Sequence, residues 1–397
     1  MSGPVAHGTP WFQRARYVTA PLRSPFVPIR VVTGRTREGG PCSILVVDDG
    51  APLKLLLAGM LAEQAEAVSL GRFSILSVPA LLRREGPNHD LVLARIPQIL
   101  AERDYHSAFL RLPWIVDMWV RADEVARRRQ RGRGTVASAY ARWRQQGFVA
   151  VQRREPADLD RFDETMYQPF ANARFGEAAS TLDRATMRRA LERGTIVWVE
   201  QDGRPVAAQL LERCGSTLHT ISVGTCLDPA AAQATGVLTA LKVAASDLAL
   251  ETGFEWIDFG GCMPWLTDGV LQNKRQWGAE LVHRGGLHRA VLASWARWTP
   301  AAAACLAMAP ICRHGATTFA VTTSTPRGNQ AADKLGFTGL DRLLIVDDAL
   351  AGGGGGGTPE VQRITPGSSG EVLAQAGLQP AGHLAAETLG SAHSVPG

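Results

Sequence analysis

Two stretches of the chain alternate apolar runs with polar turns in a way that predicts paired strands. In the first, Ile44–Val47 is apolar, Asp48–Gly50 is a turn signal, and Pro52–Ala58 is apolar again. Asp-Gly between apolar runs favours a hairpin, because glycine readily adopts the positive φ of a tight turn. The same order recurs at Ile196–Glu200, Gln201–Gly203 and Pro205–Glu212. We therefore expect a hairpin in each half of the chain.

A helix followed by a strand is expected after each hairpin. Asp90–Arg103 has a helical pattern and leads into the apolar stretch Ser107–Leu112. Gly236–Thr252 likewise leads into Glu255–Phe259. Because the same elements recur in the same order, the sequence predicts a duplicated α/β domain. Further elements are expected as helices at Ala122–Gln146, Leu159–Tyr167 and Ser294–Met308, as strands at Phe148–Gln152 and Thr318–Thr322, and as a closing unit at Asn329–Val346.

These patterns predict an α/β protein with two tandem domains, each a mixed central sheet flanked by helices. The chain after residue 348 is rich in glycine and small polar residues, so it cannot bury enough apolar surface to offset the entropy of ordering. We expect that tail to be disordered. The predicted divisions are an N-terminal arm at 1–40, a first domain at 41–146, a second domain at 147–292, a helix and closing strand unit at 293–348, and a glycine-rich tail at 349–397.

Composition narrows the class of protein. Of the 397 residues, 45% are hydrophobic and 20% are charged, which excludes wholesale disorder and a small disulfide scaffold. The six cysteines have no spacing that suits zinc, so free thiols in a reducing cytoplasm are expected. The most apolar run, Pro300–Cys312, is shorter than the roughly 20 residues that cross a membrane. We therefore expect a cytoplasmic protein without a membrane span; the sequence sets no oligomeric state.

The net charge of +5 is unevenly distributed. The segment Arg121–Arg154 holds ten arginines against Asp123 and Glu124. Clustered arginines can follow the phosphates of tRNA or of a nucleotide. The alternative is a solvated helix face or a surface for an acidic partner. By contrast, only four residues of the chain are lysines.

One stretch of the second half resembles a known family. Gly253–Gly261 reads Gly-Phe-Glu-Trp-Ile-Asp-Phe-Gly-Gly, and after a loop Asn273–Leu281 reads Asn-Lys-Arg-Gln-Trp-Gly-Ala-Glu-Leu. This is similar to the FemABX-like branch of the GNAT acyltransferase superfamily, which is built from two tandem GNAT domains. The resemblance covers roughly residues 41 to 290 and implies that the two predicted domains are GNAT-like. Asn273 stands where the family often has an aromatic residue.

The resemblance implies transfer of an acyl or aminoacyl group from a thioester or ester donor to an amine by direct attack. The carbonyl oxygen gains negative charge in the transition state and needs a cation or donor beside it. The motif lysine maps onto Lys274, which would be that catalytic cation; the alternative is a solvated loop lysine. Asp258, in the middle of an apolar strand, would orient Lys274 or take part in proton transfer. The alternative for Asp258 is a structural carboxylate satisfied by backbone donors or by arginine.

Coenzyme A binding is implied at Gln233–Gly236. GNAT proteins usually carry Q/R-x-x-G-x-G/A before a long helix, whose first N–H groups hold the pyrophosphate. Gln233 and Gly236 fit this pattern, and the last small residue is missing. We expect no permanently bound cofactor and no metal. The expected co-substrate is acyl-coenzyme A, with aminoacyl-tRNA as the open alternative, and the acceptor is an amine of a small molecule or a precursor.

Two further residues are candidates for substrate binding. Arg174 is expected on a loop that borders the acceptor site in such folds, where it would hold an acidic acceptor. His219 is expected on a strand beside the site; it would be either a substrate or catalytic residue, or a core histidine. Two other readings of the whole protein remain open from the sequence, namely a GNAT-fold binding protein without catalysis and a nucleic-acid binder acting through the arginine segment.

Overall fold

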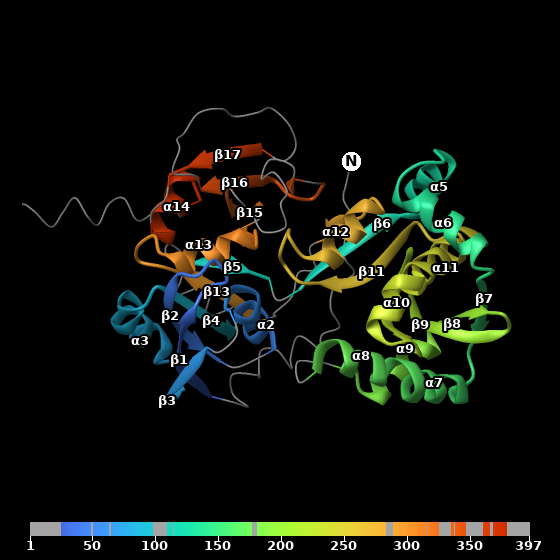
Figure 1. The fold of residues 1–397 in the computed structure, drawn as a ribbon, viewed down its shortest axis with the longest axis horizontal. Helices are drawn as coiled ribbons and strands as arrows, with labels where there is room; N and C mark the ends of the chain where they lie inside the picture. The colour runs from blue at the N-terminus through green and yellow to red at the C-terminus, as the bar shows by residue number, and fades with distance from the viewer. Residues whose placement is uncertain are drawn as a thin grey trace, which may run out of the picture.

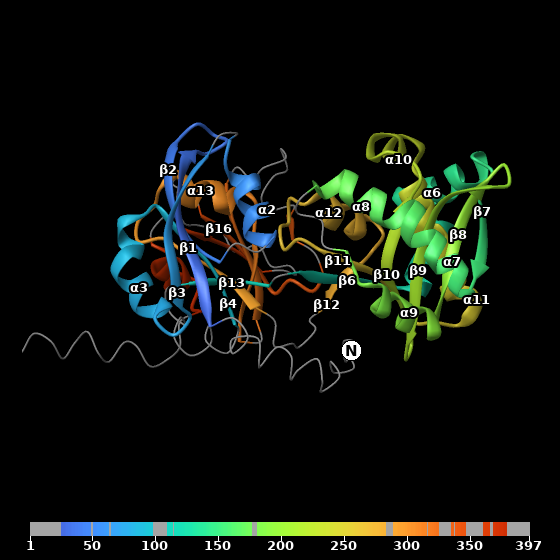
Figure 2. The same cartoon turned by 90° about the horizontal axis from the view of Figure 1, so that it is seen from below.

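The strands of the protein form three sheets (Figure 1). A computed structural model describes residues 25–48, 51–62, 65–97, 109–113, 115–176, 181–282, 289–315, 317–324, 335–336, 338–346, 360–365 and 368–378. Within those residues the sheets have six, seven and four strands. The first two sheets lie side by side along the long axis of the molecule (Figures 1 and 2).

The first sheet has the strand order β3-β1-β2-β4-β13-β5. Its only parallel pair among the described strands is β2 with β4, and all other neighbours are antiparallel. The strands are β1 (Phe26–Arg35), β2 (Pro41–Val47), β3 (Glu66–Ser74), β4 (Leu91–Pro97), β5 (Leu110–Leu112) and β13 (Arg289–Ser294). Between them lie α2 (Ala51–Met60), α3 (Val78–Glu85) and the short η1 (Gly86–Asn88).

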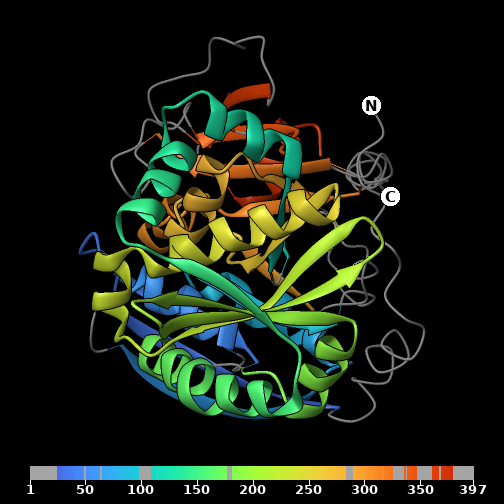
Figure 3. The same cartoon turned by 90° about the vertical axis from the view of Figure 1, so that its right-hand side faces the viewer.

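The second sheet has the order β12-β6-β11-β10-β9-β8-β7, in which β10 and β11 are parallel. Helices cover both of its faces, with α7 to α9 on one side and α5, α6 and α11 on the other (Figure 3). The strands are β6 (Val116–Arg121), β7 (Val149–Arg153), β8 (Gly194–Gln201), β9 (Arg204–Cys214), β10 (Thr217–Thr225), β11 (Trp256–Cys262) and β12 (Glu280–Val282). The helices are α5 (Ala122–Gln130), α6 (Thr135–Gln145), α7 (Pro156–Phe162), a π-helical turn (Asp163–Tyr167), α8 (Gln168–Phe175), α9 (Arg184–Glu192), α10 (Pro229–Thr235), α11 (Val237–Thr252) and α12 (Gly269–Gln276).

The two sheets repeat one pattern of strand directions. The series β8-β9-β10-β11-β6-β12 has the same sequence of antiparallel and parallel neighbours as β3-β1-β2-β4-β13-β5. In each series the fifth strand is out of chain order, since β6 is the first strand of the second sheet in the sequence and β13 joins the first sheet only after the second is complete. The expected pair of tandem mixed sheets flanked by helices is therefore confirmed.

The two middle strands of the third sheet are buried on both faces. It consists of β14 (Ile311–His314), β15 (Thr317–Thr323), β16 (Arg342–Val346) and β17 (Glu360–Ile364), accompanied by α13 (Pro300–Ala307) and α14 (Ser369–Gln375). In β16, Leu343 and Ile345 pack into the core of the second sheet, whereas Leu344 and Val346 pack into a core shared with the first. Successive side chains of a strand point to opposite faces, so this continuous apolar run joins the two cores.

The hairpin prediction holds in the second half and is wrong in the first. Strands β8 and β9 are joined at Asp202 and Gly203, which both have positive φ, 51° and 73°. Pro52–Ala58, expected as a strand, lies in helix α2. The buried side chains there are Leu53, Leu56, Leu57 and Met60. Their spacing is that of a helix face, a signal that should have outweighed the Asp-Gly turn.

Other predictions also need correction. Asp90–Arg103 was expected to be a helix, but residues 91–97 form the buried strand β4, because an apolar run between sheet neighbours suits a parallel strand better. The predicted arm at 1–40 contains β1, which pairs with two neighbours. Ala122–Gln146 is broken into α5 and α6 around Gly132 and Gly134, which have positive φ.

The C-terminal tail prediction is wrong for residues 360–378. They include β17 and α14, and Ile364, Val372 and Leu373 are buried in the core of the first sheet. The apolar side chains are few, but they reach a core that is already formed by other segments. The glycine run Gly352–Gly357 and residues 379–397 lie outside the described residues, as does 325–334 of the predicted closing unit.

Candidate functional site

Strands β10 and β11 stop pairing in the middle of the second sheet. They are in parallel register at three positions, the last of which joins His219 to Asp258. Both strands continue beyond this point, to Thr225 and Cys262. Each also has an irregularity there, between Thr220 and Ser222 in β10 and between Asp258 and Gly261 in β11. Bulges of this kind redirect strands and are common next to active sites.

His219 and Asp258 form a hydrogen-bonded pair where the parallel pairing ends. The distance from His219 Nδ1 to Asp258 Oδ2 is 2.9 Å. The other carboxylate oxygen, Oδ1, accepts the N–H of Gly260 at 2.8 Å. Asp258 is only 2% exposed, and the edge of Trp119 lies against the imidazole with ring centroids 5.4 Å apart. The carboxylate thus fixes the orientation of the imidazole ring.

Lys274 lies on α12 and is 2% exposed, so it is not a solvated loop lysine. Its Nζ donates to the carbonyl oxygens of Gly260 at 2.5 Å and Gly261 at 3.0 Å. Burial lowers the pKa of its ammonium, and the nearby Cys262, Asp258, Asp117 and Asp268 act in the opposite direction. Lys274 therefore holds the irregular part of β11, directly after Asp258.

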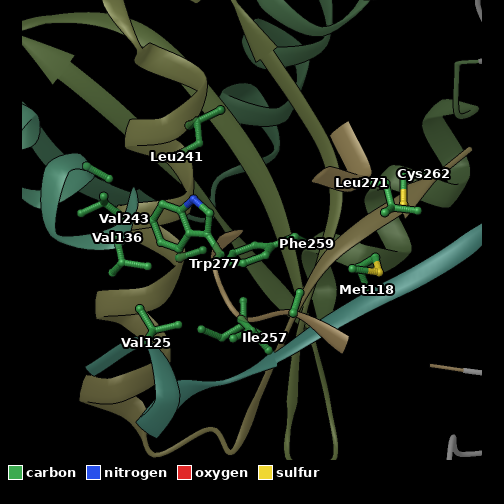
Figure 4. Packing of buried hydrophobic residues seen from close by; sticks show 14 of the residues in the cluster. Met118, Val125, Val136, Leu241, Val243, Ile257, Phe259, Cys262, Leu271 and Trp277 are labelled. Atoms are coloured by element: carbon green, nitrogen blue, oxygen red, sulfur yellow. The ribbon is translucent and has the colours of Figure 1, made fainter. Parts of the chain in front are cut away.

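Helix α12 is fixed at both ends. At its start, the Asp268 carboxylate accepts the N–H of Leu271 at 2.8 Å, and burial raises the pKa of that carboxyl. At its end, the buried Trp277 packs edge-on against Phe259 of β11, with centroids 5.6 Å apart (Figure 4). The position of Lys274 thus depends on packing between α12 and β11.

Gln233 and Gly236 lie at the junction of α10 and α11. Gly236 has φ of +74°, and its N–H donates to Gln233 O at 3.2 Å. The guanidinium of Arg142, on α6, occupies the space that a Cβ on Gly236 would need, 2.7 Å from it. A cation beside the first turn of a 16-residue helix adds to the positive end of its dipole. Arginine and helix start together can attract an anion.

Arg174 lies on helix α8, not on a loop as expected, and its side chain is exposed. Its guanidinium is 6.0 Å from the ring centroid of Phe170. It also lowers the pKa of the Asp268 carboxyl at the start of α12, against the effect of burial. The structure thus brings Arg174 into electrostatic range of the helix that carries Lys274.

Half of the ten arginines in the segment pair with carboxylates. Arg127 and Arg128 both pair with Glu124 on the same helix, and Arg129 pairs with Asp247 of α11. Five arginines have no ion pair within the described residues, namely Arg131, Arg133, Arg142, Arg144 and Arg154. A cavity of about 450 Å³ between α5, α6 and the end of α11 contains none of the predicted site residues.

Sequence reasoning missed one residue near the site, Lys242 of α11. Its Nζ lies 5.6 Å from the ring centroid of Phe259 and 5.8 Å from that of Trp277, and it donates to Asn273 Oδ1. The signal that could have found it is the scarcity of lysine, since Lys242 is one of only four.

In the part of the chain that the structure describes, no three His, Cys, Asp or Glu side chains come together in a group that could hold a metal ion.

Comparison with known families agrees with this geometry. Residues 120–269 match the acetyltransferase (GNAT) domain family. The chain contains a GNAT domain. The match runs from the end of β6 to the start of α12 and includes the parallel strands β10 and β11 with His219 and Asp258. The resemblance to the GNAT superfamily that the sequence suggested is thereby confirmed for residues 120–269.

Several solved structures are similar to the chain at low identity. FemX is 12% identical with a TM-score of 0.37, over 72% of this chain and 92% of that one. The structure of L-PGS from Bacillus licheniformis is 12% identical with a TM-score of 0.33, over 66% and 82%. A GCN5-related N-acetyltransferase from Sphaerobacter thermophilus is 14% identical with a TM-score of 0.29, over 63% and 71%. None of the curated proteins matches this chain.

Within the described residues, no helix is both long and apolar enough to cross a membrane.

Proposed function

We propose that the GNAT domain transfers an acyl group from a thioester or ester donor to an amine. The observation that carries the proposal is the His219–Asp258 pair at the last parallel position of β10 and β11. Close to it in the chain, the carbonyl oxygens of Gly260 and Gly261 accept hydrogen bonds from Lys274 Nζ. A base, a carboxylate that orients it and a buried cation are the groups that this reaction needs.

His219 is the general base of the proposed reaction. Because Asp258 accepts the proton on Nδ1, the lone pair of His219 is on Nε2. The amine nitrogen bonds to the carbonyl carbon while its proton passes to Nε2. The bond from carbon to the donor's sulfur or oxygen then breaks, and the leaving thiolate or alkoxide takes up that proton. The imidazolium formed in between is stabilised by the buried Asp258.

Lys274 supplies the positive charge for the carbonyl oxygen. An ammonium has three N–H donors, and two of those of Lys274 point to Gly260 O and Gly261 O. These two bonds fix the direction of the third. A donor held in advance stabilises a developing oxyanion without reorganisation.

The donor that this arrangement suits is acyl-coenzyme A. Gly236, Gln233 and the Arg142 guanidinium lie at the start of α11, where a pyrophosphate would meet N–H groups and a cation. The exposed Arg174 would hold a carboxylate on the acceptor. We place the reaction in the cytoplasm, consistent with six free thiols. Aminoacyl-tRNA is the alternative donor.

The decisive experiment measures thiol release from acetyl-coenzyme A with a panel of primary amines. We expect His219→Gln, Asp258→Asn and Lys274→Met each to lower turnover by about 100-fold or more. His89→Gln is the matched control, because His89 Nδ1 is also in a hydrogen bond, with Ser43 Oγ at 2.8 Å, in the first sheet. If His219→Gln and His89→Gln have the same turnover, His219 is not the base.

A second candidate function is ligand binding without catalysis. It is favoured by one observation, that Lys274 is already bonded to two main-chain carbonyls and so also has a structural role. This reading predicts that coenzyme A raises the melting temperature while no amine of the panel is acylated by the wild type. Turnover that is lost in Lys274→Met would exclude it. The same thermal-shift measurement with aminoacyl-tRNA separates the two donors.

A further inference from the structure

Lys242 is a half-buried cation with no role in the chemistry proposed above. It extends from α11 toward α12, where its ammonium lies over the edge-on pair of rings formed by Phe259 and Trp277, 5.6 and 5.8 Å from their centroids, and donates to Asn273 Oδ1. Figure 4 shows the two aromatic rings next to each other in the core. Asn273 directly precedes Lys274 in the chain, so Lys242 contacts the helix turn that carries the proposed catalytic cation.

The surroundings of Lys242 destabilise its charge. Two titratable groups act on it within the described residues, Lys274 from α12 and the thiol of Cys262 from β11. Burial and, to a smaller extent, Lys274 lower the pKa of Lys242 to about 7, whereas Cys262 acts in the opposite direction. Lys274 differs, since Asp258, Asp117 and Asp268 all favour its charged form. Lys242 lacks such carboxylates among the groups that act on it, so its charged form is not favoured in this way.

We propose that Lys242 is a positioning residue, which in its protonated form fixes α12, and hence Lys274, against α11 and β11. The part of this inference that concerns catalysis rests on the function proposed for Lys274. The part that concerns the position of α12 is independent of it.

Protonation strengthens each contact that Lys242 makes across the helix interface. An ammonium forms a charge-assisted hydrogen bond to the Asn273 oxygen and is attracted by the faces of Phe259 and Trp277. A neutral amine is a weak donor and has no cation–π attraction. Asn273 suits this contact because its amide oxygen accepts the hydrogen bond from Lys242. The aromatic residue that the resemblance leads one to expect at this position could not accept it.

The test follows the indole N–H signal of Trp277 by NMR from about pH 5.5 to about pH 9, with Trp277→Phe for assignment. We expect a transition near pH 7 in the full-length wild type. It should vanish in Lys242→Met and move to higher pH in Asn273→Asp, because a carboxylate partner favours the ammonium. Lys54→Met, at an exposed lysine of α2, is the matched control and should leave the transition unchanged. The circular dichroism of each variant verifies its fold.

Turnover is measured over the same range. If the inference is right, the wild type loses the charged contact between Lys242 and Asn273 as the pH rises from 6 to 8. The turnover of Asn273→Asp, divided by that of the wild type, should then rise about threefold or more over this range. A Trp277 transition that persists in Lys242→Met, or that does not move in Asn273→Asp, would overturn the inference. A normal transition together with unchanged turnover in Lys274→Met would instead refute the proposed function and leave the positioning of α12 by Lys242 intact.

Discussion

At the scale of single residues, the second sheet and its helices hold three charged groups, Asp258 on β11, Lys274 on α12 and Lys242 on α11. Asp258 is paired with a histidine, and Lys274 has carboxylates around it at longer range, whereas the contacts of the Lys242 ammonium in the described part of the chain are an amide and two rings. A buried charge without a counter-ion costs free energy. Lys242 is therefore a position where the fold gives up stability.

This cost predicts how stability depends on pH. The folded pKa of Lys242, about 7, is below its unfolded value, so the unfolded chain binds more protons between the two values. The contribution of Lys242 thus becomes more favourable as pH rises above 7, by at most about 1.4 kcal/mol per pH unit. We expect Lys242→Met to be more stable than wild type by about 2 kcal/mol at pH 7, and by less at pH 9. Urea unfolding at both pH values measures this, and an equal difference at the two would contradict it.

At the scale of elements, β10 is held close to the π-helical turn Asp163–Tyr167. A Cβ on Gly224 would lie 2.6 Å from the main-chain carbon of Met166 and the nitrogen of Tyr167. Backbone atoms cannot move aside as a flexible side chain can. Only glycine therefore permits this approach of the turn to the end of β10, just beyond the irregularity at Thr220 and Ser222.

Gly224→Ala should accordingly be much more harmful than an ordinary glycine substitution. We expect a loss of about 2 to 4 kcal/mol of unfolding free energy, because the strand and the turn must separate. Gly269→Ala is the matched control, since Gly269 has no atom within 4 Å of its Cβ position and begins helix α12. Chemical denaturation of both variants tests this. Similar stabilities would show that the contact can relax.

At the scale of the whole molecule, the third sheet and strand β13 connect the two halves. β6 is the first strand of the second sheet in the sequence and lies between β11 and β12, whereas β13 returns to the first sheet after the second is complete. The third sheet adds apolar side chains to both main cores. We infer that the halves do not unfold independently.

Truncation tests the part played by the C-terminal segment. A chain ending at residue 350 lacks β17 and α14, including Ile364, Val372 and Leu373, which are at most 3% exposed. Loss of several fully buried side chains should lower stability by several kcal/mol, about 1.5 to 3 for each. A chain ending at residue 378 retains every described contact and is the control. If both truncations melt at the temperature of the full chain, the segment contributes nothing to the fold.

The sequence determined the features that depend on a few neighbouring residues. The Asp202-Gly203 turn, the limits of α11 at Gly236 and Gly253, and strand β11 all follow from local backbone preferences and apolar pattern. The resemblance around Asp258 and Lys274 led to the GNAT superfamily. The role of each site residue stays a prediction.

Only the tertiary structure decided which distant segments meet. The pairing of His219 with Asp258 depends on the register of β10 against β11, and the contact of Lys242 with Asn273 depends on the packing of α11 against α12. The return of β13 to the first sheet has no local signal, and the choice between strand and helix at residues 52–58 was settled by the core around Leu53 and Met60. Local propensities amount to tenths of a kcal/mol per residue, whereas burial in a core amounts to several for each side chain, so long-range contacts prevail wherever the two disagree.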